Sequence, residues 1–224
     1  MNGSTPVIAI DGPSGSGKGT IARRVAEALG YHLLDSGALY RLTALAAIRN
    51  GVSFDDTGEL AEIARNLDVR FGSDEQGDEQ ILLDGDDVSF DIRSEKAGTG
   101  ASQVAGQNLV REALLELQRG FRKPPGLVAD GRDMGTNVFA DAVLKVFLTA
   151  SAEERAKRRH KQLKDKGMDV SLAALSRDIE DRDRRDTERL VAPLRPADDA
   201  RILDSSGQSI EAVTNTVLDW ARAV

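Results

Sequence analysis

The residues with the clearest chemical meaning form a phosphate-binding loop near the start of the sequence. In the stretch IAIDGPSGSGKGT, Gly12 is followed by four residues and then by Gly17 and Lys18, the order G-x-x-x-x-G-K. Glycines let a backbone curl until several N–H groups converge on one anion, and the lysine reaches the β and γ phosphates of a nucleotide. The alternative is an ordinary glycine-rich turn with an exposed lysine. Because an apolar run precedes the loop and an amphipathic stretch follows it, the sequence favours phosphate binding.

One position of this loop departs from the usual pattern. Gly19 stands where serine or threonine is expected, and the hydroxyl comes one place later, at Thr20. The form GKGT is the one that nucleoside monophosphate kinases carry, with the hydroxyl near the magnesium and the phosphates. We therefore expect a small-molecule kinase rather than a switch GTPase.

A second group of polar residues follows a second predicted strand. In LLDSGALYR, Ser36 is a hydrogen-bond donor, Tyr40 offers a stacking or packing surface, and Arg41 is a bidentate phosphate ligand. Open α/β sheets bind ligands at the carboxyl ends of their strands, where these residues are expected. Taken alone, Asp35-Ser36-Gly37 is simply a helix cap.

A third group lies in LVADGRDMGT, residues 127–136, where an apolar strand ends in Asp130. Asp130 is suited to orient magnesium or its waters, Arg132 to hold phosphates, and Asp133 to accept a hydrogen bond from a base amino group. A solvated turn is the alternative. The position directly after a buried strand favours a functional role.

Two further stretches carry arginines whose role the pattern leaves open. Ser102 and Arg111, in SQVAGQNLVRE, are by pattern alone a cap-like serine and an arginine on a helix surface. The region from Arg155 to Arg189 interleaves acids and arginines that pair at i,i+4 spacing, so a solvated helical face is the commoner role for any one of them. Its start, ERAKRRHK, also suits a lid that brings positive charge over a phosphate in transfer.

These groups are positioned by alternating strands and helices. Five apolar segments are predicted strands: PVIAI, YHLLDS, GLVAD, AVLKVFL and ARILDSS. Helices are expected after the loop up to Gly30, over residues 37–51 and 109–121, in a charged region from Ser151 to Arg189 broken near Gly167, and at the end of the chain. This alternation predicts an α/β fold with a mainly parallel sheet sandwiched by helices.

An acidic segment interrupts the alternation. Between Ser73 and Asp91 there are eight Asp or Glu residues and no Lys or Arg. LDVRF, EQILLDG and DDVSF are short segments separated by glycine-containing turns, which predicts a small antiparallel β insert. We divide the chain into a kinase core at 1–66, the insert at 67–93 and the rest of the core at 94–224, with a lid at about 152–168.

Composition narrows the class of protein. The chain has 224 residues, 40% hydrophobic content and a net charge of −7, which allows one substantial core and argues against a nucleic-acid polymer or a membrane surface as partner. Without cysteine there is no disulfide, thiolate metal site or cysteine nucleophile. No apolar run is long enough for a membrane span and no signal peptide is seen. We expect a cytoplasmic monomer.

Together these motifs resemble one family, the bacterial cytidylate kinases, which phosphorylate CMP and dCMP. The similarity covers nearly the whole chain, from IAIDGPSGSGKGT through LLDSGALYR, LDVRF, SQVA, VREALL, ADGRDMGT and SAEERAKRR to RDRRDTERLVAPL and ILDSS. DGRDMGT together with DSGALYR is specific, whereas the loop alone is not. The resemblance implies a P-loop NTPase fold, three-layer α/β/α with a central mainly parallel five-stranded sheet. It also implies a small three-stranded insert beside the acceptor site.

The resemblance also implies the site residues. The residues expected to bind ATP are Gly12, Pro13, Ser14, Gly15, Ser16, Gly17, Lys18, Gly19 and Thr20. Those expected to bind CMP are Ser36, Tyr40, Arg41, Ser102, Arg111, Arg132, Asp133, Arg182, Asp186 and Arg189. Within that set, the acceptor phosphate is assigned to Ser36, Arg41 and Arg132, the cytosine to Ser102, Arg111 and Asp133, and the sugar to Arg182, Asp186 and Arg189. The expected catalytic residues are Lys18, Arg132, Arg155 and Arg158.

The expected cofactor is Mg²⁺, brought as MgATP, with Thr20 near the metal and Asp130 acting through water. The reaction is an in-line attack of a CMP phosphate oxygen on the γ-phosphorus, and the acceptor phosphate, already largely ionised, needs no general base. Two rivals stay open. One is another P-loop kinase acting on AMP, UMP or shikimate, and the other is a nucleotide-binding regulatory module without turnover. The glycines at 98 and 100 lower helix propensity, so the start of the helix before Ser102 is left open.

Overall fold

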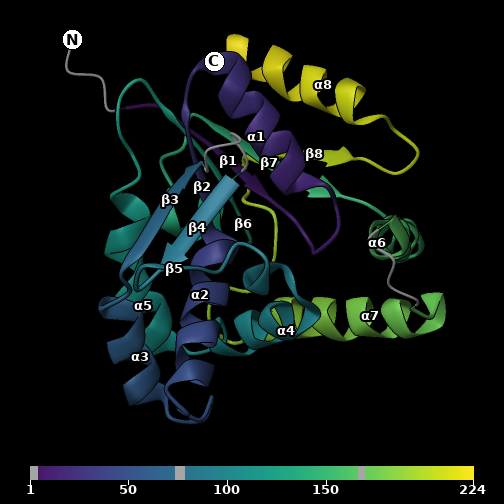
Figure 1. Cartoon of the computed structure of the whole chain (residues 1–224). Helices are drawn as coiled ribbons and strands as arrows, with labels where there is room; N and C mark the ends of the chain where they lie inside the picture. The colour runs from purple at the N-terminus through teal and green to yellow at the C-terminus, as the bar shows by residue number, and fades with distance from the viewer. Residues whose placement is uncertain (1–4, 74–78, 166–169) are drawn as a thin grey trace. The chain divides into compact units, whose positions relative to one another are not determined.

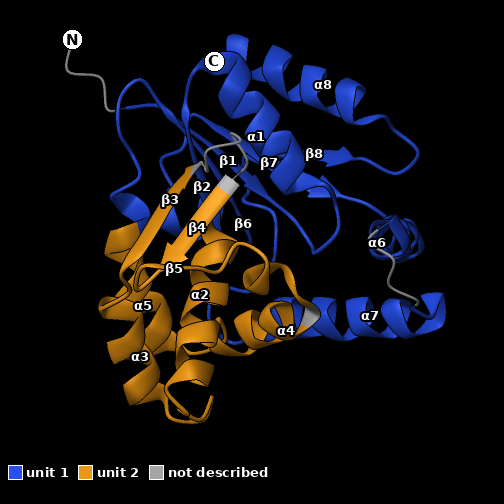
Figure 2. Ribbon diagram, in the orientation of Figure 1, with its two compact units in different colours: residues 1–35, 118–224 blue, residues 36–117 orange. Residues whose placement is uncertain are grey.

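The structure is a computed structural model, and it describes residues 5–73, 79–165 and 170–224. The chain forms two compact units (Figure 2). We call residues 1–35 with 118–224 the core unit, and residues 36–117 the inserted unit. The inserted unit leaves the core unit directly after its second strand, at the boundary between Asp35 and Ser36.

The core unit is built on a five-stranded sheet, ordered β2-β6-β1-β7-β8 with every adjacent pair parallel. The strands are β1 (Val7–Asp11), β2 (His32–Asp35), β6 (Leu127–Gly131), β7 (Leu144–Thr149) and β8 (Arg201–Asp204). All residues of β1 and β6 are buried, as expected of central strands covered on both faces. The predicted five strands and their parallel arrangement are confirmed.

Helices α1 (Lys18–Leu29) and α8 (Ile210–Arg222) lie side by side on the sheet of the core unit (Figure 1). One hydrophobic cluster joins them to it, because Ile21 and Val25 of α1 and Val213 and Val217 of α8 pack with apolar residues of β1, β6 and β7. Gly30 ends α1 in the left-handed conformation, with its N–H directed at carbonyls of the last turn, as predicted.

Two further helices of the core unit, α6 (Ala152–Asp165) and α7 (Leu172–Glu188), pack against each other. They account for most of the predicted charged region, and α7 begins with a cap in which Ser171 accepts a hydrogen bond from the N–H of Ala174. The predicted break near Gly167 and the last residues of the predicted lid lie outside the described residues. None of the helices in the described ranges has the length and hydropathy that a bilayer span requires.

The inserted unit combines helices with the predicted small sheet. It holds α2 (Ser36–Arg49), α3 (Thr57–Arg65), the 3₁₀ turn η1 (Asp91–Arg93), α4 (Glu95–Val104) and most of α5 (Asn108–Arg119). Its strands β3 (Val69–Ser73), β4 (Glu79–Leu83) and β5 (Asp86–Asp87) pair antiparallel in that order, inside the predicted segment 67–93. Ile81 and Leu83 pack on α2 through Ala38 and Leu42, which makes the compact unit larger than the sheet. A separate domain at 67–93 stays a prediction.

Helix α4 forms despite its glycines. Ser94 caps it by accepting a hydrogen bond from the N–H of Ala97. A Cβ at Gly100 would lie 3.0 Å from the Cβ of Ala44 on α2, and Phe54 lies on the same side. Close packing of α4 on α2 therefore explains a glycine that lowers the intrinsic helix propensity.

Candidate active site

The phosphate loop connects β1 to α1 in the core unit, and its backbone favours glycine at three positions, one of which is Gly15 with a φ of 77°. Gly17 adopts a φ of 93° as it begins α1, with no side chain capping the first turn. A Cβ on Gly12 would fall 2.1 Å from the carbonyl oxygen of Leu148. The N-terminal N–H groups of α1 therefore have no side-chain cap in front of them, as an anion site requires.

Two polar groups inside the loop lack the surroundings that normally satisfy them. The hydroxyl of Ser16 is fully buried and has no hydrogen-bond partner in the described part of the chain. The ammonium of Lys18 is buried and donates to the carbonyl of Pro13 at 3.1 Å. Burial, followed by the charge of Arg132, lowers the pKa of Lys18 to about 7, although Asp130 opposes the shift. A bound polyanion would supply negative charge next to Lys18 and so stabilise its protonated form.

Asp130 and Asp11 are the last acidic residues of β6 and β1, and both are buried. The Asp130 carboxylate lies 3.1 Å from the place that a Cβ on Gly19 would take, close to the start of α1. Asp11 accepts hydrogen bonds from the backbone N–H groups of Met134 and Gly135, both at 2.8 Å. It thereby ties the phosphate loop to the segment that follows β6.

That segment is a short π-helical turn, η2 (Met134–Val138), in which the N–H of Phe139 bonds to the carbonyl of Met134 at 2.7 Å. The turn follows the predicted site residues Arg132 and Asp133, the latter only 2% exposed. Asn137, within the turn, donates to Asp133 at 3.3 Å.

Five of the charged residues predicted for the acceptor, Arg132, Asp133, Arg182, Asp186 and Arg189, belong to the core unit. Arg132 donates through Nε to Asp186 of α7 at 2.8 Å, and Arg189 lies 3.9 Å from Asp133. The pKa of Asp186 is lowered. Burial acts to raise this pKa, but the guanidinium of Arg132 lowers it, and Arg182 and Arg189 add to the lowering. The structure therefore brings Lys18, Asp130, Arg132, Asp133, Arg182, Asp186 and Arg189 together.

The two arginines predicted for the lid contact the phosphate loop through its backbone. Arg155, 4% exposed, donates to the carbonyl of Ser14 at 3.1 Å and forms two bonds to Asp183 on α7. Arg158 donates to the carbonyl of Ser16 at 3.2 Å and to the backbone carbonyl of Ser205 at 2.7 Å. In this structure both guanidinium groups therefore hold protein groups, and their catalytic role stays a prediction.

The remaining predicted acceptor residues belong to the inserted unit. Ser36, Tyr40, Ser102 and Arg111 are all buried, on α2, α4 and α5. The Arg111 guanidinium lies over the Tyr40 ring, 5.6 Å from its centroid, and donates to the carbonyl of Ala105 at 3.3 Å. Arg41 donates to the carbonyl of Ile92 at 3.2 Å. Within this unit the structure thus brings Tyr40 and Arg111 together, in a cation–π contact.

The sequence is similar to one family of known proteins over nearly its whole length. The model of the family described as cytidylate kinase matches residues 8–223. The chain belongs to the cytidylate kinase family. It is 58% identical over 219 residues to a cytidylate kinase of Pseudomonas aeruginosa (strain UCBPP-PA14), covering 97% of this chain and 96% of that protein. The cytidylate kinase of Methylococcus capsulatus (strain Bath) is 58% identical with both chains covered completely, and that of Cupriavidus necator (strain H16) is 57% identical over 97% of this chain and 96% of that protein.

Three residues with site contacts in this cytidylate kinase family member were not predicted from the sequence. Asp11 holds η2, Asp183 holds Arg155, and the Ser205 hydroxyl lies 3.0 Å from the carbonyl of Ser16. Asp11 had the same signal as Asp130, an aspartate that ends an apolar strand. Asp183 and Ser205 gave no comparable signal, since their partners lie far from them in the sequence.

Proposed function

We propose that the protein is an ATP-dependent CMP and dCMP kinase, which transfers the γ-phosphate of MgATP to give CDP or dCDP and ADP. The observation that carries the proposal is a cationic cluster of the core unit, in which Lys18 is buried and Arg132 and Arg182 are partly buried. Lys18, Arg132 and Arg182 lie close enough for their charges to act on one another, beside the uncapped start of α1. Such a concentration of positive charge suits a triphosphate and an acceptor phosphate brought close together. Membership of the cytidylate kinase family supports cytidylate as the acceptor.

On this proposal the phosphate loop, Gly12–Thr20, binds the ATP phosphates through its backbone N–H groups and Lys18. Phosphates beside Lys18 raise its pKa and keep the ammonium charged. The CMP phosphate oxygen attacks the γ-phosphorus in line, and ADP leaves. Catalysis then consists of positioning and charge compensation, since the acceptor phosphate is already largely ionised near neutral pH.

The residues around Thr20 fit a magnesium ion that arrives with the nucleotide. In the described ranges, no group of three acidic or histidine side chains is placed to hold a metal ion by itself. Thr20 is exposed at the start of α1, and the buried Asp130 lies beside Gly19. Thr20 would bind the ion directly and Asp130 through water, with the other ligands coming from phosphates. The ion would compensate charge on the β and γ phosphates.

The predicted acceptor residues keep the roles that the sequence assigns to them. We propose that Arg132, with Ser36 and Arg41, binds the CMP phosphate, and that Arg182, Asp186 and Arg189 bind the sugar. Ser102, Arg111 and Asp133 read the cytosine, whose amino group needs an acceptor and whose O2 and N3 need donors. The position of Arg111 over the Tyr40 ring, together with its hydrogen bond to the carbonyl of Ala105, supports this because both contacts restrict the guanidinium.

A coupled assay of ADP release with CMP, dCMP, UMP, AMP and shikimate as acceptors tests the proposal. We expect kcat/KM for CMP or dCMP to exceed that for AMP and shikimate by at least about 10³-fold, since a site built to hydrogen-bond a base rejects one that leaves its groups unpaired. Equal turnover with AMP would refute the acceptor assignment, and binding of ATP without turnover of any acceptor would favour a regulatory module.

The same proposal includes a monomeric, cytoplasmic enzyme and a closing lid at about 152–168.

A further inference from the structure

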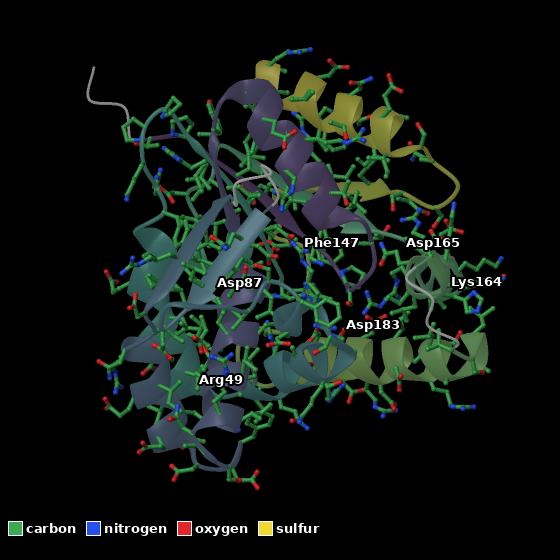
Figure 3. The ribbon with its side chains drawn as sticks, viewed as in Figure 1. Arg49, Asp87, Phe147, Lys164, Asp165 and Asp183 are labelled. Carbon is green, nitrogen blue, oxygen red and sulfur yellow. The ribbon has the colours of Figure 1, made fainter. Side chains whose placement is uncertain are left out.

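Helix α7 carries two carboxylates that each hold an arginine of the active site. Asp186 accepts a hydrogen bond from Arg132 at 2.8 Å, on the side of the segment that follows β6. Asp183 accepts two from Arg155, at 3.0 and 2.5 Å; Asp183 is labelled on α7 in Figure 3. Residues three apart lie on neighbouring positions of one helix face, so both ion pairs move with the same helix.

Arg155 links Asp183 to the phosphate loop. The Nη1 that bonds to Asp183 also donates to the carbonyl of Ser14 at 3.1 Å, while Nε donates to the carbonyl of Ala150 at 3.0 Å. The Cβ of Arg155 lies 3.2 Å from where a Cβ on Gly15 would stand, so α6 directly touches the loop. The guanidinium is rigid and planar, and its three anchors therefore fix the loop relative to α7.

Of the three contacts of Arg155, we expect the ion pair with Asp183 to contribute most. Bidentate bonds between an arginine and a carboxylate are stronger and more directional than bonds between neutral groups. Arg155 is 4% exposed, so removing the carboxylate would leave a buried guanidinium without its charged partner. The Ser14 carbonyl would then be held by a less well oriented donor.

We propose that Asp183 is a positioning residue for the phosphate loop, and that α7 makes the affinity for the donor nucleotide depend on the acceptor. The inference rests on the proposed function for the identity of the two nucleotides. An acceptor bound at Arg132 and Asp186 shifts or stiffens α7. Because Asp183 of α7 holds Arg155, this change alters the position or rigidity of the loop that binds the ATP phosphates. Linkage requires the converse, so ATP must change the affinity for CMP by the same factor.

Calorimetric titration with the magnesium complex of AMP-PNP, with and without saturating CMP, tests the inference on the full chain. For wild type we expect CMP to tighten the Kd of the analogue. Asp183→Asn should weaken binding of the analogue about tenfold and bring the ratio of the two Kd values close to one. The Kd for CMP alone should stay within about twofold, and Asp183→Glu should recover part of the loss, which a purely structural role of this position would not produce.

Asp181→Asn is the matched control. It makes the same chemical change on the same helix, in an exposed pair in which Asp181 contacts Arg184 at 2.6 Å, and should leave both Kd values at the wild-type level. If circular dichroism shows that Asp183→Asn does not fold, Arg155→Lys decides, because lysine keeps the charge and loses the two-pronged bond. A wild-type Kd for the analogue in that variant would overturn the inference.

Two outcomes separate this inference from the proposed function. A wild-type chain that phosphorylates CMP, with an Asp183→Asn variant that keeps the affinity and the Kd ratio of wild type, overturns the inference alone. A wild-type chain that binds neither the analogue nor CMP overturns both.

Discussion

The core unit and the inserted unit hold their site residues in different ways. In the core unit the charged side chains face one another. Arg132 pairs with Asp186, and Arg189 lies near Asp133. The charges of Arg132 and Asp130 shift the pKa of Lys18 in opposite directions. In the inserted unit, Arg41 and Arg111 donate to backbone carbonyls, and the Arg111 guanidinium lies over the Tyr40 ring.

The difference indicates two kinds of work. A group of opposed charges at low exposure can offset the charge of phosphates and re-pair when they bind, which suits phosphoryl transfer. An arginine fixed by a ring and a carbonyl keeps its orientation, which suits recognition of the edge of a base. Variants in the core unit should therefore affect kcat, and variants in the inserted unit should mainly affect KM for the acceptor.

Lys18→Met should have the largest effect on turnover. The variant removes the one loop side chain that places positive charge on the transferring phosphate, and kcat should fall about 10³-fold or more. Its thermal stability should equal or exceed that of wild type, because burial lowers the pKa of Lys18 and the buried charge is lost. Steady-state kinetics and thermal melts check both. A kcat within tenfold of wild type would end the proposed mechanism.

Arg132→Ala comes next and tests whether the charges of the core unit act on the acceptor. We expect kcat/KM for CMP to fall about 10²-fold, since both a phosphate ligand and the partner of the buried Asp186 are lost. The Kd of AMP-PNP should change little. If instead the affinity for the analogue fell while the KM for CMP stayed constant, Arg132 would belong to the donor side.

Arg111→Lys probes the inserted unit and should have a smaller effect. Lysine keeps the charge over Tyr40 but loses the planar donor set, so KM for CMP should rise about tenfold with kcat changed much less. Selectivity for CMP over UMP should fall as well. A loss of kcat without a change in KM would contradict the division of work between the units.

Much of the fold follows from local patterns. All five core strands are short apolar runs that end at glycine or polar residues, and their alternation with helices fixes a parallel sheet. The helix α3 gives a weaker signal, because its buried face consists of Leu60, Ala61 and Ala64, and two of these are small. The doubt over α4 came from intrinsic propensity, and the packing of Gly100 on Ala44 removes it.

The site was predictable where its residues occupy strand ends and loops, as for Lys18, Asp130 and Arg132. The site was less predictable where the sequence offers one side chain several possible partners. Around Arg155 the sequence offers acids on both sides, and only the packing of α6 on α7 selects Asp183. Charge pattern alone could not show that this guanidinium turns toward the backbone of the phosphate loop.

The last prediction concerns stability and not turnover, and it tests whether the acidic side chains near Asp11 raise its pKa in the protein without ligand. Burial raises the pKa of Asp11 to about 7, with Asp133 and Asp130 adding to the shift against two backbone hydrogen bonds. An unfolded aspartate titrates near about 3.9. The folded state therefore holds more protons between these values, and the stability that Asp11 contributes is present below about pH 4 and lost as the pH rises to about 7.

Asp11→Asn removes this titration, so the stability of wild type relative to the variant should fall from pH 5 to about pH 7, by at most about 1.4 kcal/mol per pH unit, and level off above that. Denaturant unfolding across that range measures how the difference in stability changes with pH. The variant also loses one hydrogen-bond acceptor, but this shifts its stability by the same amount at every pH and does not change the slope. Asp199→Asn is the control: Lys145 lowers the pKa of this exposed carboxylate, so its difference from wild type should stay flat above pH 5. A flat difference for Asp11→Asn too would mean that Asp11 stays ionised, held by η2 more strongly than its acidic neighbours repel it.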